Sequence, residues 1–510
     1  MPGMLQQTLR FWATRWPDRI ASHCVGRSIT WGELDRSSDQ IAAGLFKAGL
    51  RKGDRLGILM RNRVEFLQVL MGAIKLGAPV VLHNIRFTPK EMIYPIQDAG
   101  IKVVVAETAL ANLLADAARD APALKIYTTE LLDGCRPLSE LANCTDAPPD
   151  YDIAPEDVAL VCYTSGTTGY PKGAMLTHSN IRESTIGEIL PAGMTNADRP
   201  LISLPLAYTW GTVSFLRECL MIGATSVIIE PTDGVDGLID ILVKERITSW
   251  CTPALLFERV GASPRFGDTD FSHLRRAMCG SMTPHIFHTW KKAGVILTQA
   301  WGLTEASGSA SSLYDEDAER KMGSCGRAIL NCEIKAVDDE GRTLAPNEPG
   351  ELLVRGPIIM KGYINKPEET AKTMAGDWLR TGDCGTVDEE GFVSIVDRFK
   401  DMVRSGGLNI YPAELERVLA GVKGLEEFAI IGVKDDRWGE VPMIVAHSAQ
   451  PLDLAQLKHR ATEELSGYKR PHYFVDHGEP LPRTVSGKII KGELREAYPA
   501  APANVVRLRD

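Results

Sequence analysis

The chain has 510 residues, a formal net charge of -9 and charged side chains at 24% of its positions. This length is more than one hydrophobic core supports, so we expect at least two domains. The acidic balance argues against broad nucleic-acid binding. Hydrophobic residues make up 44% of the chain, which is ordinary for a soluble globular protein.

No segment of the sequence has the length and apolar character of a membrane span. The longest candidate, 67–82, is interrupted by Gln68 and Lys75, and residues 1–19 lack the apolar core of a signal peptide. The ten cysteines are scattered, with no CxxC pair among them. These features predict a reduced, cytoplasmic protein without an integral membrane segment.

Strands and helices alternate over residues 28–107. A buried strand over 54–60 is followed by a helix that begins near Val64, by Gly77 and by another strand. This alternation predicts right-handed crossovers and a largely parallel sheet. Residues 108–157 are rich in Ala, Asp and Pro and predict a variable surface excursion.

A glycine- and threonine-rich loop follows the next apolar strand. Residues 164–173, TSGTTGYPKG, hold three glycines, three threonines, a serine and a lysine. Main-chain N–H groups and hydroxyls in such a loop form a concave donor surface for phosphate oxygens, and Lys172 adds a positive charge. The loop is not the common GxxxxGK[ST] phosphate loop, because Lys172 follows Pro171 and precedes Gly173.

The chain after this loop continues the alternation of helices and strands. Asn180, with Glu183 three positions later, marks the start of a helix. The segments 201–211, 274–284 and 295–308 each place a strand before a polar, glycine-containing turn. Because ligands bind beyond the carboxyl ends of the strands in an open parallel sheet, we expect these turns to converge on one site.

The composition changes near residue 330, where short strands separated by turns predict a small antiparallel subdomain. Beyond Asp401 the pattern predicts a compact unit of helices and strands. We therefore expect an α/β protein with an N-terminal domain over 1–397, a hinge over 398–401 and a C-terminal α+β domain over 402–510.

Five sequence motifs occur in order along the chain. They are TSGTTGYPKG (164–173), WGLTE (301–305), DWLRTGDCG (377–385), DRFKDMVRSGGLNIYPAELE (397–416) and PRTVSGKI (482–489). Together they resemble the motifs of the adenylate-forming superfamily, and in particular of its acyl-CoA synthetases. The resemblance implies a large N-terminal domain of parallel α/β sheets, a small antiparallel β subdomain and a small, mobile α+β C-terminal domain.

The resemblance also implies a site for ATP and Mg²⁺. Thr304 would contact the α-phosphate, Glu305 would bind Mg²⁺, and Lys488 would reach the substrate carboxylate and the α-phosphate, so these three are the expected catalytic residues. Asp383 would accept the ribose hydroxyls, with Arg398 nearby. The residues that the resemblance assigns to binding of ATP and CoA are Thr164, Ser165, Gly166, Thr167, Thr168, Lys172, Gly280, Ser281, Trp301, Gly302, Asp383, Arg398, Lys400 and Gly406.

The expected pocket for the acid departs from the usual family pattern. Tyr208 stands where many relatives carry a histidine, and Trp210 follows two residues later. Together with Met282 these aromatic residues favour a ring-bearing or branched acid over a simple straight-chain one, although packing of Trp210 in the core is an equally open reading. The residues expected to line this pocket are Tyr208, Trp210, Met282, Ala300 and Gly308.

These interpretations predict an ATP-dependent acid–CoA ligase that acts on a fatty, aromatic or alicyclic acid. The partners expected are the acid, ATP and CoA, with no nucleic acid, and a homodimer is left open. The alternative within the fold is an acyl-AMP ligase that loads a carrier protein. An amino-acid-activating domain is disfavoured because the sequence around Tyr208 offers no aspartate for an amine. A luciferase-type oxygenase and a non-catalytic scaffold are the remaining alternatives.

Overall fold

The structure is a computed structural model, and it describes residues 4–164, 171–230, 234–280, 282–398, 401–405, 408–435, 437–448, 450–465, 467–483, 489–502 and 505–509. Its contacts divide the chain into two compact units. Unit 1 comprises residues 1–334, 354–380 and 391–393, and unit 2 comprises residues 335–353, 381–390 and 394–510. The finer boundaries at 398–401 stay a prediction.

Unit 1 contains an eight-stranded sheet in the order β19-β9-β8-β4-β3-β5-β6-β7. Strands β3 to β8 pair in parallel, and β9 runs antiparallel to β8. The strands are β3 (Leu56–Leu59), β4 (Val80–Leu82), β5 (Val103–Ala106), β6 (Lys125–Thr128), β7 (Arg136–Pro137), β8 (Val158–Thr164), β9 (Lys172–Thr177) and β19 (Gly362–Tyr363).

One expectation for this sheet is wrong. Residues 108–157 are not only a surface excursion, because β6 and β7 extend the parallel sheet beyond β5. In β6 only Tyr127 and Thr128 are buried, while Lys125 is exposed. The strand is therefore too short and too polar to give the continuous apolar run by which the other strands were recognised.

A second sheet in unit 1 has nine strands in the order β16-β15-β14-β13-β12-β10-β11-β1-β2. It is parallel from β1 through β14, and β2, β15 and β16 are added antiparallel at its two ends. The strands are β1 (Ile20–Cys24), β2 (Arg27–Thr30), β10 (Pro200–Ile202), β11 (Ser226–Ile228), β12 (Ser249–Cys251), β13 (Arg276–Cys279), β14 (Leu297–Leu303), β15 (Gly308–Ser312) and β16 (Arg327–Ala328).

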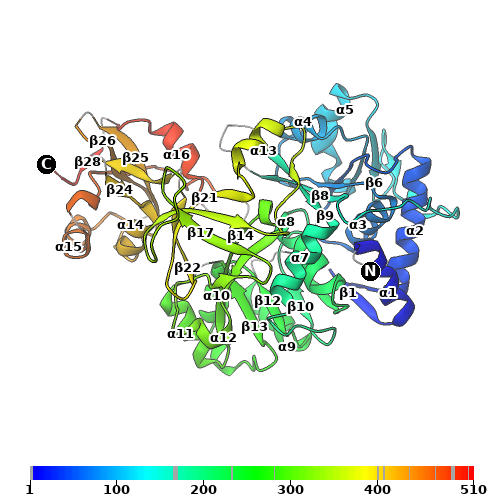
Figure 1. Cartoon of the computed structure of the whole chain (residues 1–510), viewed down its shortest axis with the longest axis horizontal. Helices are drawn as coiled ribbons and strands as arrows, with labels where there is room; N and C mark the ends of the chain where they lie inside the picture. Colours follow the sequence, from blue (N-terminus) through cyan, green and yellow to red (C-terminus); the bar gives the residue numbers. More distant parts are fainter. Residues whose placement is uncertain are drawn as a thin grey trace. The chain divides into compact units, whose positions relative to one another are not determined.

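Helices pack around both sheets of unit 1, and α1, α2 and α3 lie together near the N-terminus (Figure 1). Helix α3 is almost entirely buried and ends at Gly77, whose φ of 69° is the left-handed conformation that glycine adopts without strain. The helices are α1 (Leu5–Arg15), α2 (Trp31–Lys47), α3 (Val64–Leu76), α4 (Pro89–Asp98), α5 (Ala115–Asp120), α6 (Ser139–Ala142), α7 (His178–Ile189), α8 (Thr209–Ser214), α9 (Val235–Lys244), α10 (Ala254–Gly261), α11 (Pro284–Lys292), α12 (Asp315–Ala318) and α13 (Pro367–Thr373).

A small antiparallel sheet follows residue 330, as the sequence predicts. It has the order β17-β18-β21-β20, with β22 paired to β21. The strands are β17 (Glu333–Val337), β18 (Gly350–Arg355), β20 (Met374–Ala375), β21 (Trp378–Val387) and β22 (Val393–Arg398).

The C-terminal part of unit 2 is an α+β fold around a six-stranded sheet in the order β24-β23-β26-β27-β28, with β25 paired to β26. Alternate residues of β25 enter two different apolar clusters, Ile430 one and Ile431 the other, so the sheet is covered on both faces. The elements are β23 (Val403–Ser405), β24 (Leu408–Ile410), α14 (Pro412–Leu419), β25 (Glu427–Asp435), β26 (Gly439–His447), α15 (Leu454–Glu464), β27 (Tyr473–Asp476), α16 (Lys491–Ala497) and β28 (Val506–Arg507).

Within the described ranges, none of the helices combines the length and the apolar character needed to cross a bilayer.

Candidate active site

The glycine- and threonine-rich loop connects two paired strands of unit 1. Strands β8 and β9 form an antiparallel hairpin whose last described pair is Thr164 opposite Lys172. The Oγ1 atom of Thr164 also lies 3.4 Å from the main-chain oxygen of Lys172. The expected phosphate-binding residues Ser165, Gly166, Thr167 and Thr168 lie outside the described residues. The hairpin thus fixes both ends of the predicted phosphate loop.

Lys172 is held at the base of this loop by a carboxylate that the sequence analysis did not identify. Its Nζ atom lies 2.5 Å from Oε2 of Glu369 and 5.4 Å from the centre of the Tyr363 ring. Hydrogen bonds from Lys172 and Lys372 lower the pKa of Glu369 to about 2. Because the Lys172 side chain is only 11% exposed, a phosphate would reach its ammonium group only in competition with Glu369.

Glu305 lies next to the same hairpin. Strand β14 ends at Leu303, and a 3-10 turn over Thr304–Ala306 carries the Glu305 side chain toward Thr164 and Tyr363. Oε1 of Glu305 accepts hydrogen bonds from the Tyr363 hydroxyl at 2.8 Å and from the Thr164 hydroxyl at 3.3 Å. Burial, with the nearby Glu305 carboxylate, raises the pKa of Tyr363, so this hydroxyl stays a hydrogen-bond donor at neutral pH.

The environment of Glu305 fits a magnesium site that substrate phosphates would complete. Mg²⁺ is usually held by one or two carboxylates together with phosphate oxygens and water. The two hydrogen-bond partners of the Glu305 carboxylate are the neutral hydroxyls of Thr164 and Tyr363, so among the described residues no cation neutralises it. Nor do the described residues include a group of three or more His, Cys, Asp and Glu that could bind a metal ion without a substrate.

The main chain of the Glu305 turn is anchored by the segment 357–360. The amide of Met360 donates to the main-chain oxygen of Glu305 at 2.8 Å. Asn180, in the first turn of α7, donates from Nδ2 to the main-chain oxygens of Pro357 and Ile359, both at 2.8 Å. Through Asn180, helix α7 therefore helps to position the turn over Thr304–Ala306 that carries Glu305.

The start of α7 differs from the expectation built on Asn180 and Glu183. The helix begins at His178, and Thr177 is its N-cap. The Thr177 hydroxyl accepts from the Asn180 amide at 3.1 Å, and the Asn180 side chain accepts from the Thr177 amide at 2.9 Å. This reciprocal pair is a capping box in which asparagine takes the place of the usual Glu or Gln. The sequence pattern, which paired Asn180 with Glu183, therefore placed the start of the helix three residues too late.

Glycine is required where β14 and β15 pair as antiparallel neighbours. A Cβ atom on Gly302 would lie 1.9 Å from the main-chain oxygen of Gly308, so these strands approach too closely for any side chain. Trp301, expected to stack on adenine, is buried. Gly280 follows the end of β13 and has open space beside it, whereas Ser281 lies outside the described residues.

Two of the residues expected in the acid pocket, Tyr208 and Trp210, lie at the start of α8. The Tyr208 hydroxyl donates to Oδ1 of Asn84 at 2.7 Å, and burial raises the pKa of Tyr208 to about 12, so the phenol is neutral. Trp210 is half-buried in the first turn of α8. The hydroxyls of Thr209 and Thr304 lie 3.4 Å apart, which places this turn beside the Thr304–Ala306 turn.

The other expected pocket residues have different surroundings. Ala300 is half-buried in β14. Met282 is partly buried and packs against an apolar cluster of unit 1. Gly308 has a φ of 115°, and a Cβ atom there would lie 3.1 Å from Nη1 of Arg217.

Arg217 belongs to a buried charge cluster that the sequence analysis missed. Nη1 of Arg217 lies 2.6 Å from Oε2 of Glu188, Nη2 lies 3.2 Å from Oε1 of Glu218, and Arg276 pairs with both glutamates. Although burial opposes its ionisation, Arg217 and Arg276 hold the pKa of Glu188 below its usual range. The only sequence signal was the presence of charged residues inside the apolar run 213–222, and it did not reveal their partners.

The remaining expected residues belong to unit 2 or lie outside the description. Asp383 is buried in β21, and its amide donates to the Thr381 hydroxyl at 3.1 Å. Arg398 is the last residue of β22. Lys400, Gly406 and Lys488 lie outside the described residues.

Comparison with known proteins identifies the family. Residues 9–364 match the family described as AMP-binding enzyme, and residues 414–488 match the AMP-binding enzyme C-terminal domain. A feruloyl-CoA synthase of Amycolatopsis sp. is 33% identical over 97% of this chain and 100% of its own length. A long-chain-fatty-acid–CoA ligase of Mycobacterium tuberculosis is 32% identical over 92% of this chain and 93% of its own length.

Solved structures agree with this assignment. The o-succinylbenzoate CoA synthetase from Bacillus subtilis, in complex with its acyl-adenylate intermediate, has a TM-score of 0.86 and 28% identity, covering 97% of this chain and 99% of that one. The same enzyme has also been solved with ATP and a magnesium ion, with a TM-score of 0.84 to this chain, 28% identity and coverage of 96% and 99%.

The chain therefore belongs to the AMP-binding enzyme family. Its fold and its relatives define the class as the AMP-forming acyl-CoA ligases, which join a carboxylic acid to CoA through an acyl-AMP intermediate.

Proposed function

We propose that this chain activates a ring-bearing carboxylic acid with ATP and transfers the acyl group to CoA. The observation that carries the proposal is the contact network that joins Thr164 and Lys172, at the two ends of the phosphate loop, to Glu305, Tyr363 and Glu369. The network brings the Glu305 carboxylate, which would bind Mg²⁺, to the loop that would hold the triphosphate.

The reaction has two steps with defined bond changes. An oxygen of the acid attacks the α-phosphorus of ATP, the bond to the β-phosphate oxygen breaks, and acyl-AMP and pyrophosphate form. The sulfur of CoA then attacks the acyl carbonyl carbon, its proton is released, and the carbon–oxygen bond to AMP breaks. Both steps bring anions together, so we expect catalysis to depend on positioning and charge compensation.

The residues of the hairpin and the adjacent turn have separate tasks in this proposal. Thr164, Lys172 and the residues between them would hold the β- and γ-phosphates, with Lys172 exchanging Glu369 for phosphate oxygens. Thr304 would donate its hydroxyl to the α-phosphate. Glu305 would hold Mg²⁺ together with the phosphates, and the bound ion would neutralise negative charge on the leaving pyrophosphate.

Unit 2 would supply the remaining groups. Asp383 would accept hydrogen bonds from the ribose hydroxyls, with Arg398 nearby. Lys488 would neutralise charge between the acid and the α-phosphate during adenylation, and the hinge at 398–401 would then let the C-terminal domain present Gly406 and its neighbours to the pantetheine of CoA. We place the reaction in the cytoplasm, where ATP and CoA are available.

The choice of a ring-bearing acid is supported by the aromatic residues at the start of α8. The neutral Tyr208 hydroxyl is already bonded to Asn84, so this side chain presents a ring rather than a charge to a neighbouring ligand. Half-buried Trp210 adds a second flat surface, and flat aromatic surfaces favour aromatic partners over flexible chains. The feruloyl- and o-succinylbenzoate-activating relatives handle acids of this kind.

The experiment is mass spectrometry of products formed from ATP and Mg²⁺ with straight-chain, aromatic and alicyclic acids, each with and without CoA. Accumulation of an aromatic acyl-CoA would support the proposal. A fatty acyl-CoA alone would contradict the assignment of the acid, and acyl-AMP that persists with CoA present would favour transfer to a carrier protein.

A further inference from the structure

Tyr363 contacts two charged residues of the predicted phosphate and magnesium site. Its hydroxyl donates to Oε1 of Glu305 at 2.8 Å, and the Nζ atom of Lys172 lies 5.4 Å from the centre of its ring. A cation at such a distance is attracted by the face of an aromatic ring. One side chain thus reaches both the expected magnesium ligand and the expected phosphate-binding lysine.

The main chain around Tyr363 is fixed from two sides. Strand β19, which contains Tyr363, pairs with β9 of the hairpin. The Ile364 amide donates to the main-chain oxygen of Gly173 at 2.8 Å. From the other side, the Tyr363 amide donates to the Thr370 hydroxyl of α13 at 2.9 Å. The tyrosine is therefore tied to the same hairpin that holds both ends of the phosphate loop.

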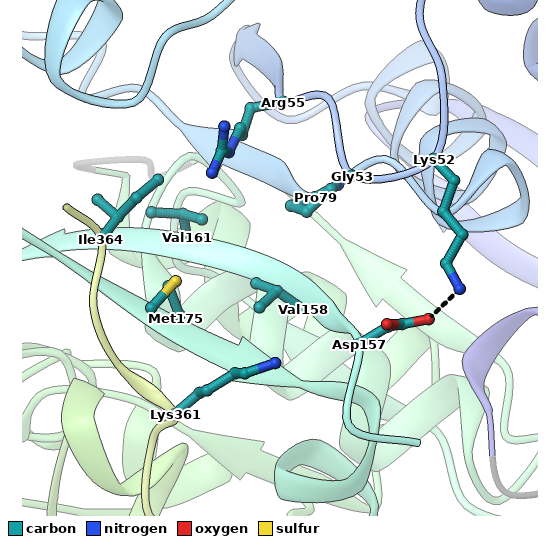
Figure 2. A pocket seen from close by; sticks show the side chains of 11 residues that line it. Lys52, Gly53, Arg55, Pro79, Asp157, Val158, Val161, Met175, Lys361 and Ile364 are labelled. Atoms are coloured by element: carbon teal, nitrogen blue, oxygen red, sulfur yellow. Dashed lines mark ion pairs between the residues drawn. The ribbon is translucent and has the colours of Figure 1, made fainter. Parts of the chain in front are cut away.

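The Tyr363 side chain and the Ile364 side chain pack on opposite faces of the eight-stranded sheet. Figure 2 shows Ile364 beside Val161, and both belong to one apolar cluster. Tyr363 belongs to another cluster together with Cys162, the neighbour of Val161 in β8, and successive residues of a strand point to opposite faces. The Tyr363 ring therefore lies on the face where Glu305 is found, and with only 8% of the residue exposed it has little freedom to turn away.

The two oxygens of the Glu305 carboxylate have different surroundings. Oε1 accepts both hydrogen bonds, from the Tyr363 hydroxyl and from the Thr164 hydroxyl at 3.3 Å. Among the residues that the structure describes, none donates a hydrogen bond to Oε2. The ammonium group of Lys172 is paired with Glu369 rather than with this carboxylate. Oε2 is therefore the oxygen that is left for a metal ion.

The two hydroxyl donors differ in what ATP would do to them. Thr164 belongs to the residues proposed to hold the phosphates, so its hydroxyl would turn from Glu305 to a phosphate oxygen. Tyr363 lies outside that set, so its hydrogen bond would persist and keep the carboxylate oriented while Oε2 meets the ion. Hydrogen bonds to a ligating carboxylate are important for metal binding, and the loss of one typically costs roughly 10- to 100-fold in metal affinity.

We propose that Tyr363 is a positioning residue that orients Glu305 to bind Mg²⁺ through Oε2 alone. The inference rests on the proposed function, in which Glu305 is the magnesium ligand. Tyr363→Phe removes the hydroxyl that acts on Glu305 and keeps the ring that faces Lys172. This variant therefore affects the metal ligand while leaving the phosphate-binding lysine in its surroundings.

Isothermal titration calorimetry of the full-length protein with ATP, without acid or CoA, tests this role in excess Mg²⁺ and again in EDTA. We expect Tyr363→Phe to bind the magnesium complex of ATP about tenfold more weakly than the wild type and to bind metal-free ATP equally well. Tyr163→Phe is the matched control, because it removes from the same hairpin a half-buried phenol hydroxyl that donates to Asp98 at 2.8 Å. It should change neither affinity.

Glu305→Gln in the same titrations separates this inference from the proposed function. A weaker preference for the magnesium complex in Glu305→Gln and in Tyr363→Phe, with no further loss in the double variant, would show that Tyr363 acts through Glu305. A loss in Glu305→Gln alone would overturn the role of Tyr363 and leave Glu305 as the ligand. An equal preference in the wild type and both variants would overturn the magnesium role of Glu305 as well.

The titration in EDTA distinguishes a positioning role from a structural one. If Tyr363→Phe lost metal-free ATP and the magnesium complex by the same factor, the hydroxyl would support the site as a whole, and the proposal would be overturned. None of these results bears on acyl-CoA formation, which the product experiment measures separately.

Discussion

At the scale of single residues, the side chain whose chemistry the structure defines best is Glu305. We expect Glu305→Gln to lower kcat by about 10²–10³, because the amide keeps its hydrogen-bonding oxygen but loses the charge needed to hold Mg²⁺ with the phosphates. Pyrophosphate release measured across a Mg²⁺ titration checks this, and a higher Mg²⁺ requirement should accompany the loss. Glu368→Gln, on exposed surface of α13, is the control and should leave both quantities unchanged.

His83 predicts how stability depends on pH. Its imidazole is buried without a hydrogen-bond partner in the described structure, and burial lowers its pKa to about 4. Between pH 4 and the unfolded value near 6.5 the unfolded state binds more protons than the folded state, so stability falls as the pH is lowered through this range. For a fully buried group the loss is on the order of 3 kcal/mol.

Urea denaturation at several pH values between 4 and 7 measures this slope. We expect a shallower slope in His83→Phe, which removes the titrating group and keeps an aromatic ring. Part of the slope should persist because His178, which accepts a hydrogen bond from the Leu5 amide at 3.3 Å, is also buried and has its pKa lowered to about 4. An unchanged slope in His83→Phe would mean that His83 is accessible to protons in the folded state.

At the scale of elements, the close antiparallel pairing of β14 and β15 holds the turn over Thr304–Ala306 in place. Gly302→Ala should reduce both the melting temperature and the adenylation rate, because its Cβ atom would collide with the Gly308 carbonyl and separate the two strands. Gly237→Ala, in helix α9 with open space beside it, is the matched control and should be neutral or stabilising by up to about 1 kcal/mol. Thermal melts and pyrophosphate assays on both variants show whether Gly302→Ala disturbs only the turn that carries Glu305 or destabilises the protein as a whole.

The buried charge cluster joins α7, the π-helix Phe215–Leu220 and β13. Arg217→Met should destabilise the protein by about 3–5 kcal/mol, because it leaves Glu188 charged, buried and deprived of one of its two arginines. Adding Glu188→Leu to this variant should recover part of the loss, as measured by urea denaturation. A double variant less stable than either single one would show that packing rather than charge pairing dominates here.

At the scale of the whole molecule, Lys488 separates the two half-reactions. We expect Lys488→Ala to lower acyl-AMP formation by several orders of magnitude while leaving thioester formation from supplied acyl-AMP within a few-fold of the wild type. Rapid-quench assays of each half-reaction measure this difference. Equal losses in both would contradict the proposed division of tasks in the C-terminal domain.

The sequence predicted the architecture well because its signals are local. Continuous apolar runs identified β3, β4, β5 and β8, and Gly77 after the apolar helix α3 marked a true helix end. The strand β6 was missed because its pattern is short and half polar. Thr304, Glu305 and Lys172 were identified by their motifs, and the structure brings the last two into one network with Thr164.

The partners of these residues could not be predicted from the sequence. Glu369 follows Lys172 by 197 positions and Tyr363 follows Glu305 by 58, and single side chains at such separations leave no periodic signal. Asn84, which binds the Tyr208 hydroxyl, is 124 positions away from it. Contacts of this kind are set by the packing of the whole unit, which one sequence does not display.

The nine-stranded sheet has a consequence for synthesis of the chain on the ribosome. Strand β1 pairs with β11 through Ser22 and Ser226, which are 226 - 22 = 204 residues apart. At about 5–20 residues per second, the first strands emerge roughly 10–40 s before the partner that covers their open edge. A nascent chain therefore carries an uncovered β-edge for much of its translation, and we expect newly made protein to depend on a chaperone that shields it until β11 has left the exit tunnel.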